Sequence, residues 1–93
     1  LVIDMEKHQV LRGDEKIHLT PIEFKIVALL ARHAGKVLTY DFLLKNIWGP
    51  YVDDIQTLRV NMANIRRKLE INPADPLYIQ TETGVGYRMV EEA

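Results

Sequence analysis

The sequence TPIE at residues 20–23 fixes where the first helix of this chain begins. Thr20 can cap a helix, Pro21 suits the first helical position, and Glu23 can bond back to the backbone N–H of the cap. The helix is expected to end at His33 to Gly35, because glycine readily takes the left-handed conformation that follows a helix. Between these ends an apolar stripe predicts a helix that is buried over much of its circumference. The stripe consists of Ile22, Ile26, Leu29 and Leu30, and Phe24 and Val27 widen it.

Strand-like and helical segments lie on both sides of this helix. Before it, LVIDM, HQVLR and EKIHL have the length and apolar content of strands, and Gly13 and Asp14 separate the last two, which predicts a small antiparallel meander. After it, a second helix is expected from about residue 40 to 48, capped by Thr39 and ended by Gly49 and Pro50. The apolar side of this second helix is expected to be Phe42, Leu43, Ile47 and Trp48.

A third helix and a hairpin complete the expected order of elements. The third helix is expected from about residue 55 to 70, with Asp54 as its cap and Asn72 and Pro73 closing it. The tail LYIQTETGVGYRMV contains two strand-like pieces around a glycine-containing turn, which predicts a hairpin over residues 77–90. Helix, loop and helix followed by a hairpin is the order of a winged helix-turn-helix, although the loop is longer than the usual turn of about 3 to 4 residues.

The third helix concentrates positive charge in a chain whose formal net charge is −1. Its sequence QTLRVNMANIRRKL, residues 56–69, contains no carboxylate. Helical periodicity places Leu58, Met62, Ile65 and Leu69 on one stripe, the expected core face. The opposite face is expected to carry Gln56, Val60, Ala63, Asn64 and Arg67, with Arg59 and Arg66 on one flank and Asn61 and Lys68 on the other.

This outward face has the composition of a surface that reads DNA. A merely solvated helix usually mixes charges of both signs to gain pairs between residues four apart, whereas this one excludes carboxylates. Asparagine and glutamine amides can pair with an adenine edge, valine can touch a thymine methyl, and arginine can pair with guanine or phosphate. The pattern favours a recognition helix in the DNA major groove over a merely solvated helix. The preceding helix would then cross the DNA backbone.

Other kinds of function find little support in the residue types. There is no cysteine and no serine, and His8, His18 and His33 lack metal-ligand spacing, so neither a metal site, a cofactor nor an enzyme activity is expected. Asp53 and Asp54 are better explained by helix capping than by catalysis. No apolar run is long enough to span a membrane and the first residues do not form a signal peptide, so a cytoplasmic protein is expected. The first residue is leucine, which suggests a domain cut from a longer protein.

Four motifs make the chain resemble a known family over nearly its whole length. LTPIEFKIVALLARHAGKVLT, LLKNIWG, TLRVNMANIRRKLE and IQTETGVGYR resemble, in order and spacing, the C-terminal effector domain of OmpR/PhoB-type response regulators. WGP, LRVNMANIRRKLE, NPADP and TETGVGYR are similar to the Kdp-type members, which control a potassium-transport operon. The resemblance implies a single α+β domain over residues 1–93, with an N-terminal antiparallel four-stranded sheet, a three-helix bundle and a C-terminal hairpin wing. Its fourth strand is expected near residues 36–38.

The resemblance also implies partners and site residues. A receiver domain upstream would be phosphorylated by a sensor histidine kinase, and two effector domains would then associate head to tail on direct-repeat promoter sites in double-stranded DNA. Base contacts are expected from Val60 and Asn64 with Arg59 nearby, and Arg67 lies on the same outward face. Phosphate contacts are expected from Arg66, Asn61, Thr81, Tyr87 and the backbone of Trp48. The loop that relatives use to contact RNA polymerase corresponds to Pro50, Tyr51, Val52, Asp53 and Asp54.

Two departures from the family and one alternative function follow from the same residues. Thr83 stands in the wing where several relatives have a minor-groove arginine, and Ala63 stands where some have an arginine, so each predicts a missing contact. Trp48 is also suited to packing at the core boundary. The alternative function is a winged-helix module for protein interaction, in which the cationic face binds an acidic partner or the loop binds RNA polymerase.

Overall fold

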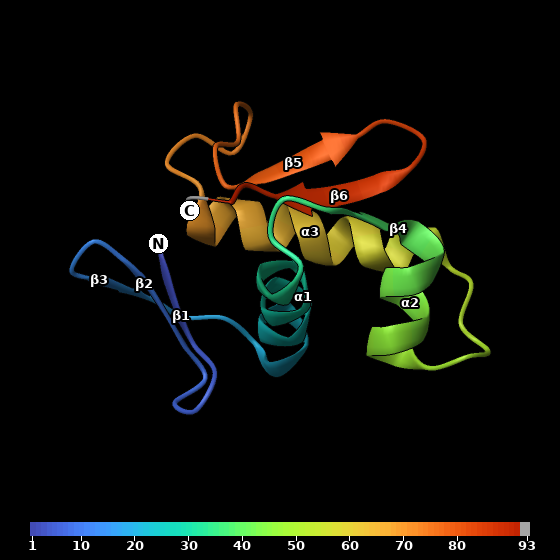
Figure 1. Cartoon of the computed structure of the whole chain (residues 1–93), viewed down its shortest axis with the longest axis horizontal. Helices are drawn as coiled ribbons and strands as arrows, with labels where there is room; N and C mark the ends of the chain where they lie inside the picture. Colours follow the sequence, from blue (N-terminus) through green and yellow to red (C-terminus); the bar gives the residue numbers. More distant parts are fainter. Residues whose placement is uncertain (92–93) are drawn as a thin grey trace.

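The structure is a computed structural model that describes residues 1–91. Two three-stranded antiparallel sheets flank three helices (Figure 1). The elements along the chain are β1 (Val2–Asp4), β2 (Gln9–Arg12), β3 (Glu15–Ile17), α1 (Pro21–Arg32), β4 (Val37–Thr39), α2 (Tyr40–Trp48), α3 (Ile55–Leu69), β5 (Ile79–Glu82) and β6 (Gly86–Met89). The α+β winged-helix fold expected from the sequence is confirmed.

The predicted four-stranded N-terminal sheet is wrong in one detail. A strand does form at the expected place, as β4, but it pairs with β6 of the hairpin and leaves β1, β2 and β3 as a separate sheet. The register places Leu38 opposite Tyr87 and Thr39 opposite Gly86. A Cβ atom at position 86 would lie 1.8 Å from the carbonyl oxygen of Leu38. Glycine at this position therefore allows β4 to approach the hairpin and extend the wing into a three-stranded sheet.

The capping box of α1 forms as the sequence predicts. The Glu23 backbone N–H donates to Thr20 Oγ1 at 3.2 Å, and the Thr20 backbone N–H donates to Glu23 Oε1 at 2.9 Å. The helix is buried around much of its circumference, although Ile22 and Leu29 are only partly covered. The buried apolar residues of α1 are Phe24, Ile26, Val27, Ala28 and Leu30.

The two following helices begin at the predicted caps. Thr39 Oγ1 accepts from the Phe42 backbone N–H at 3.1 Å, and Asp54 Oδ1 accepts from the Gln56 backbone N–H at 2.9 Å. The prediction that Phe42 joins the apolar side of α2 is only partly right, because its side chain is 38% exposed and packs edge-on against His33. The buried residues of α2 are Leu43 and Leu44, and the predicted Ile47 and Trp48 are partly buried and pack against the core.

The C-terminal end of α3 is held by hydrogen bonds to two other parts of the fold. Arg12 of β2 donates from Nη1 to the carbonyl oxygen of Leu69 at 2.6 Å, which satisfies one of the carbonyls left free at a helix C-terminus. Glu70, the C-cap, is 3% exposed, and its carboxylate accepts from the backbone N–H groups of Leu77, Tyr78 and Ile79. The helix is thus fixed both to the N-terminal sheet and to the start of the wing.

No helix within residues 1–91 is long and apolar enough to cross a membrane.

Candidate nucleic-acid interface

The predicted division of α3 into a core face and an outward face is confirmed. The stripe of Leu58, Met62, Ile65 and Leu69 is at most 1% exposed. The outward face, which we define as Gln56, Val60, Ala63, Asn64 and Arg67, is exposed at four positions and partly covered at Asn64. Val60 in the middle of this face is 50% exposed. This face is available to a partner along the length of the helix.

Arg66 lies on the flank nearest the wing and joins α3 to β5. Its Nη2 donates to the carbonyl oxygen of Ile79 and to Thr81 Oγ1, both at 2.8 Å. Its guanidinium carbon lies 5.4 Å from the centre of the Tyr87 ring. Three residues predicted separately as phosphate contacts, Arg66, Thr81 and Tyr87, are therefore brought together. Because Thr81 accepts from Arg66, its own hydroxyl proton is free to donate outward.

A cluster of two tyrosines and two arginines supports this flank. The rings of Tyr40 and Tyr87 meet edge to face with 5.5 Å between their centres, and Arg59 lies over Tyr40 at 5.9 Å. Burial raises the pKa of Tyr87, and Tyr40 nearby raises it further, while the charges of Arg66 and Arg59 oppose this shift. The cluster places two guanidinium groups against two aromatic rings, a favourable cation–π arrangement. Tyr40 was not among the predicted site residues.

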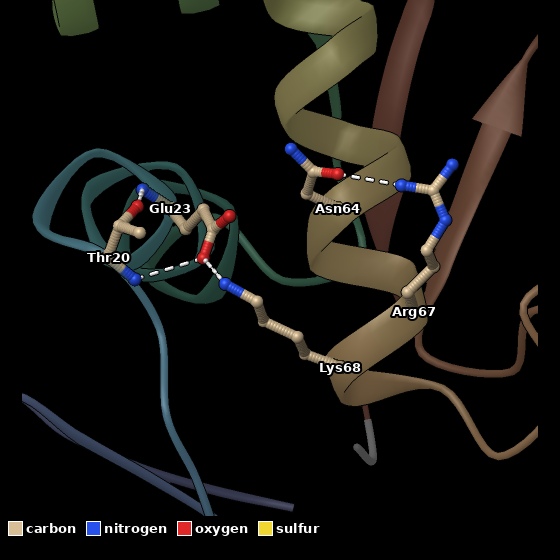
Figure 2. Close-up of polar contacts among 5 residues, drawn as sticks. All are labelled: Thr20, Glu23, Asn64, Arg67 and Lys68. Atoms are coloured by element: carbon tan, nitrogen blue, oxygen red, sulfur yellow. Dashed lines mark hydrogen bonds and ion pairs between the residues drawn. The ribbon is translucent and has the colours of Figure 1, made fainter.

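Lys68 lies on the opposite flank and does not face outward for a partner. Its ammonium donates to Glu23 Oε1 of α1 at 2.6 Å, and the Glu23 side chain is 4% exposed (Figure 2). Burial acts to raise the pKa of Glu23, but the Lys68 hydrogen bond and charge, together with the Thr20 backbone amide and hydroxyl, lower it below its usual value. Of the four cations in residues 56–69, this one serves to hold α3 against α1.

Two asparagine amides on α3 are bonded in opposite senses. Arg67 donates from Nη1 to Asn64 Oδ1 at 2.7 Å, so the Asn64 amide oxygen is engaged (Figure 2). Asn61 instead donates from Nδ2 to the carbonyl oxygen of Thr57 at 2.9 Å, so its nitrogen is engaged. The predicted phosphate contact of Asn61 is therefore limited to the second N–H of its amide.

The remaining predicted contact residues lie around α2 and the loop before α3. Trp48 is partly covered and packs against the core, as expected of a boundary residue. In the loop, Tyr51 is 97% exposed, whereas Val52 packs against the core. Asp54 caps α3 as well as belonging to the loop. Among the described residues no group of histidines and carboxylates is arranged to hold a metal ion.

Comparisons with known proteins place this architecture in a family. Residues 14–89 match the sequence profile of the family described as "Transcriptional regulatory protein, C terminal". The response regulator DrrB of Thermotoga maritima, described as an OmpR/PhoB homolog, superposes with a TM-score of 0.87 at 36% identity over 95% of this chain and 40% of its own. The chain belongs to the OmpR/PhoB family of response regulators.

Relatives within the OmpR/PhoB family refine the comparison. KdpE of Escherichia coli K12, the KDP operon transcriptional regulatory protein, is 46% identical over 97% of this chain and 40% of its own length. KdpE of Mycobacterium tuberculosis is 41% identical over 92% of this chain and 38% of its own. The chain thus spans about two fifths of the length of these relatives. The RstA DNA-binding domain of Klebsiella pneumoniae, solved in complex with the RstA box, superposes with a TM-score of 0.87 at 33% identity over 97% of this chain and 90% of its own.

Proposed function

We propose that this OmpR/PhoB-family domain binds double-stranded DNA sequence-specifically, as the output domain of a two-component transcriptional regulator. In this arrangement α3 enters the major groove and the hairpin of β5 and β6 lies near the minor groove. The observation that carries the proposal is the outward face of α3, which is exposed and free of carboxylates while its core stripe is fully buried. The RstA domain, similar in fold and sequence, was solved in complex with the RstA box, which supports the same mode here.

The contacts around α3 support a division between phosphate and base readout. The bond from Arg66 to Thr81 leaves Arg66 Nη1 and the Thr81 hydroxyl as donors on the flank beside the wing, where a phosphate would be held between helix and hairpin. The proposed phosphate set is Arg66, Asn61, Thr81, Tyr87 and the backbone of Trp48. The proposed base-reading set is Val60, Asn64, Arg59 and Arg67. Base-edge contacts of this kind carry the sequence specificity, whereas phosphate contacts fix position.

The partners of the whole regulator are part of the same proposal. Phosphorylation of a receiver domain by a sensor histidine kinase would favour pairing, and two effector domains would bind direct repeats head to tail. RNA polymerase would be contacted by the loop from Pro50 to Asp54. The 97% exposure of Tyr51 supports a protein contact there, because a large aromatic side chain gains most when a partner covers it.

Selection of binding sites from random duplex DNA tests the proposal, followed by a salt titration on the recovered site. Three to four phosphate contacts give a slope of log K against log salt of about −3 per domain. Recovery of a direct repeat supports tandem binding as well. If no duplex is bound near 50 mM salt, the DNA-binding proposal is wrong, and the alternative of a protein-interaction module with an acidic partner takes its place.

A further inference from the structure

The hydrogen bond between Arg67 and Asn64 determines which polar atoms the outward face of α3 can offer. The two residues lie three positions apart and hence on neighbouring turns of one helix face. Figure 2 shows the Arg67 guanidinium reaching across to the Asn64 amide, with the amide nitrogen on the side away from it. Within residues 1–91 this nitrogen has no hydrogen-bond partner. It is therefore available to a ligand.

The chemistry of arginine fixes the direction of this bond. Arginine has five N–H donors and no acceptor, so whichever amide atom faces Arg67 must be the oxygen. The 2.7 Å contact thus leaves the Nδ2 group of Asn64 and the other N–H groups of Arg67 pointing away from the bond.

The pair consequently offers donors and positive charge but little acceptor capacity. Two-point pairing of asparagine with adenine needs the amide oxygen to accept from the adenine N6 amino group. Here an amino group approaching that oxygen would also meet the guanidinium that already holds it. Guanine presents two adjacent acceptors, N7 and O6, on its major-groove edge. Both are attracted to a cationic surface on which donors outnumber the one remaining lone pair of Asn64 Oδ1, which lies beside the guanidinium.

We propose that Asn64 and Arg67 act as one donor-rich, cationic unit that selects guanine over adenine at the base that the unit faces. The inference rests on the proposed DNA binding and names the base chemistry of that same site. The predicted preference for guanine differs from the preference for adenine that an asparagine without this bond would be expected to show. The neighbouring Asn61, whose nitrogen is the engaged atom, shows that the helix fixes its amides individually, so amides of one residue type can present opposite atoms.

Base preferences of three proteins on one library identify the position and test the inference. Sites are selected from random duplex DNA with the unaltered domain, with Asn64→Ala and with Arg67→Met, after circular dichroism has confirmed that each variant folds. The position whose preference changes in Asn64→Ala is the one that the unit faces. At this position the unaltered domain is expected to prefer guanine over adenine by about tenfold or more, the size of one good base contact.

Adenine affinity in Arg67→Met decides whether the bond to Asn64 sets the preference, because loss of a direct guanine contact by Arg67 would lower guanine affinity without raising adenine affinity. Methionine keeps an apolar stem but donates no hydrogen bond, so it frees the Asn64 oxygen to accept from adenine. The ratio of guanine to adenine affinity is expected to fall at least about fivefold, with adenine gaining. Asn64→Asp keeps a partner for Arg67 but replaces the outward donor with an acceptor, and is expected to weaken guanine binding strongly. Asn61→Ala is the control: as a change in the proposed phosphate set it should weaken binding to both bases alike and leave the ratio unchanged.

Base analogues separate this reading from effects of DNA shape. Replacing the guanine with 7-deazaguanine removes the N7 acceptor and should weaken binding, whereas inosine keeps N7 and O6 and should bind as guanine does. Preference for adenine in the unaltered domain, or an adenine affinity that does not rise in Arg67→Met, overturns the inference while leaving DNA binding intact. Failure of the unaltered domain to bind any duplex refutes the proposed function instead.

Discussion

Replacing Lys68 with methionine removes the ammonium that faces the buried Glu23 carboxylate and keeps most of the apolar stem. Losing one partner of a fully buried pair costs about 3 to 5 kcal/mol, whereas an exposed pair contributes about 0 to 1 kcal/mol. The Glu23 side chain is 4% exposed but Lys68 is 38% exposed, so water screens one end of this pair. We therefore expect the free energy of unfolding to fall by about 1 to 2 kcal/mol at pH 7.

The effect of Lys68→Met should depend on pH in a defined direction. The folded-state pKa of Glu23 is lowered, so its contribution to stability is complete above the ordinary pKa of about 4.3 and is lost as the pH falls through the lowered folded value. Without Lys68, burial acts with less opposition and the pKa rises. The protonated carboxyl group no longer needs the ammonium, so the difference between the two proteins should shrink as the pH falls from 7 to about 3.

Urea unfolding followed by circular dichroism at several pH values measures both effects. Lys45→Met is a matched control, since Lys45 pairs with Asp41 on an exposed surface where the side chains are 45% and 71% accessible. It should change stability by no more than about 0.5 kcal/mol. An unchanged midpoint for Lys68→Met at pH 7, or a loss of equal size at pH 7 and pH 3, would refute the reasoning.

Three further substitutions probe the wing and its attachment to α3. Gly86→Ala would place a Cβ atom 1.8 Å from the Leu38 carbonyl oxygen, so we expect a loss of at least about 2 kcal/mol in thermal unfolding, and an unchanged midpoint would contradict the close approach of β4. Glu70→Gln replaces a carboxylate that accepts from three backbone N–H groups with a single acceptor oxygen and should cost about 1.5 to 3 kcal/mol by urea unfolding; a neutral result would argue against the cap. Arg66→Ala should weaken binding to every duplex alike and reduce the salt slope by about one, and an unchanged slope would remove Arg66 from the phosphate contacts.

Local patterns in the sequence predicted the helices and the core face of α3 well. The capping box at Thr20, the caps at Thr39 and Asp54, and the stripe from Leu58 to Leu69 all depend on residues within a few turns of one another. Such short-range signals carry their own physical cause, because a cap or a stripe acts within one helix. The predicted elements therefore match the observed ones closely.

Contacts between distant segments could not be read in the same way. The bond from Lys68 to Glu23 joins residues 45 positions apart, and the helical periodicity of the sequence does not predict it. The pairing of β4 with β6 likewise depends on Gly86 meeting a strand far away in the sequence. The bond from Arg67 to Asn64 is different, because a spacing of three on one helix face already brings side chains together. This signal was present in the sequence, and considering the pair jointly would have found it.

The affinity of Asn64→Ala for two duplexes tests the central claim that α3 reads DNA sequence. Fluorescence anisotropy at one salt concentration would compare the variant with the unaltered domain on a selected site and on a shuffled duplex of the same composition. The account predicts a loss of about 1 to 3 kcal/mol on the selected site and almost none on the shuffled one. An equal loss on both duplexes, or no loss on either, would contradict base reading by the outward face of α3.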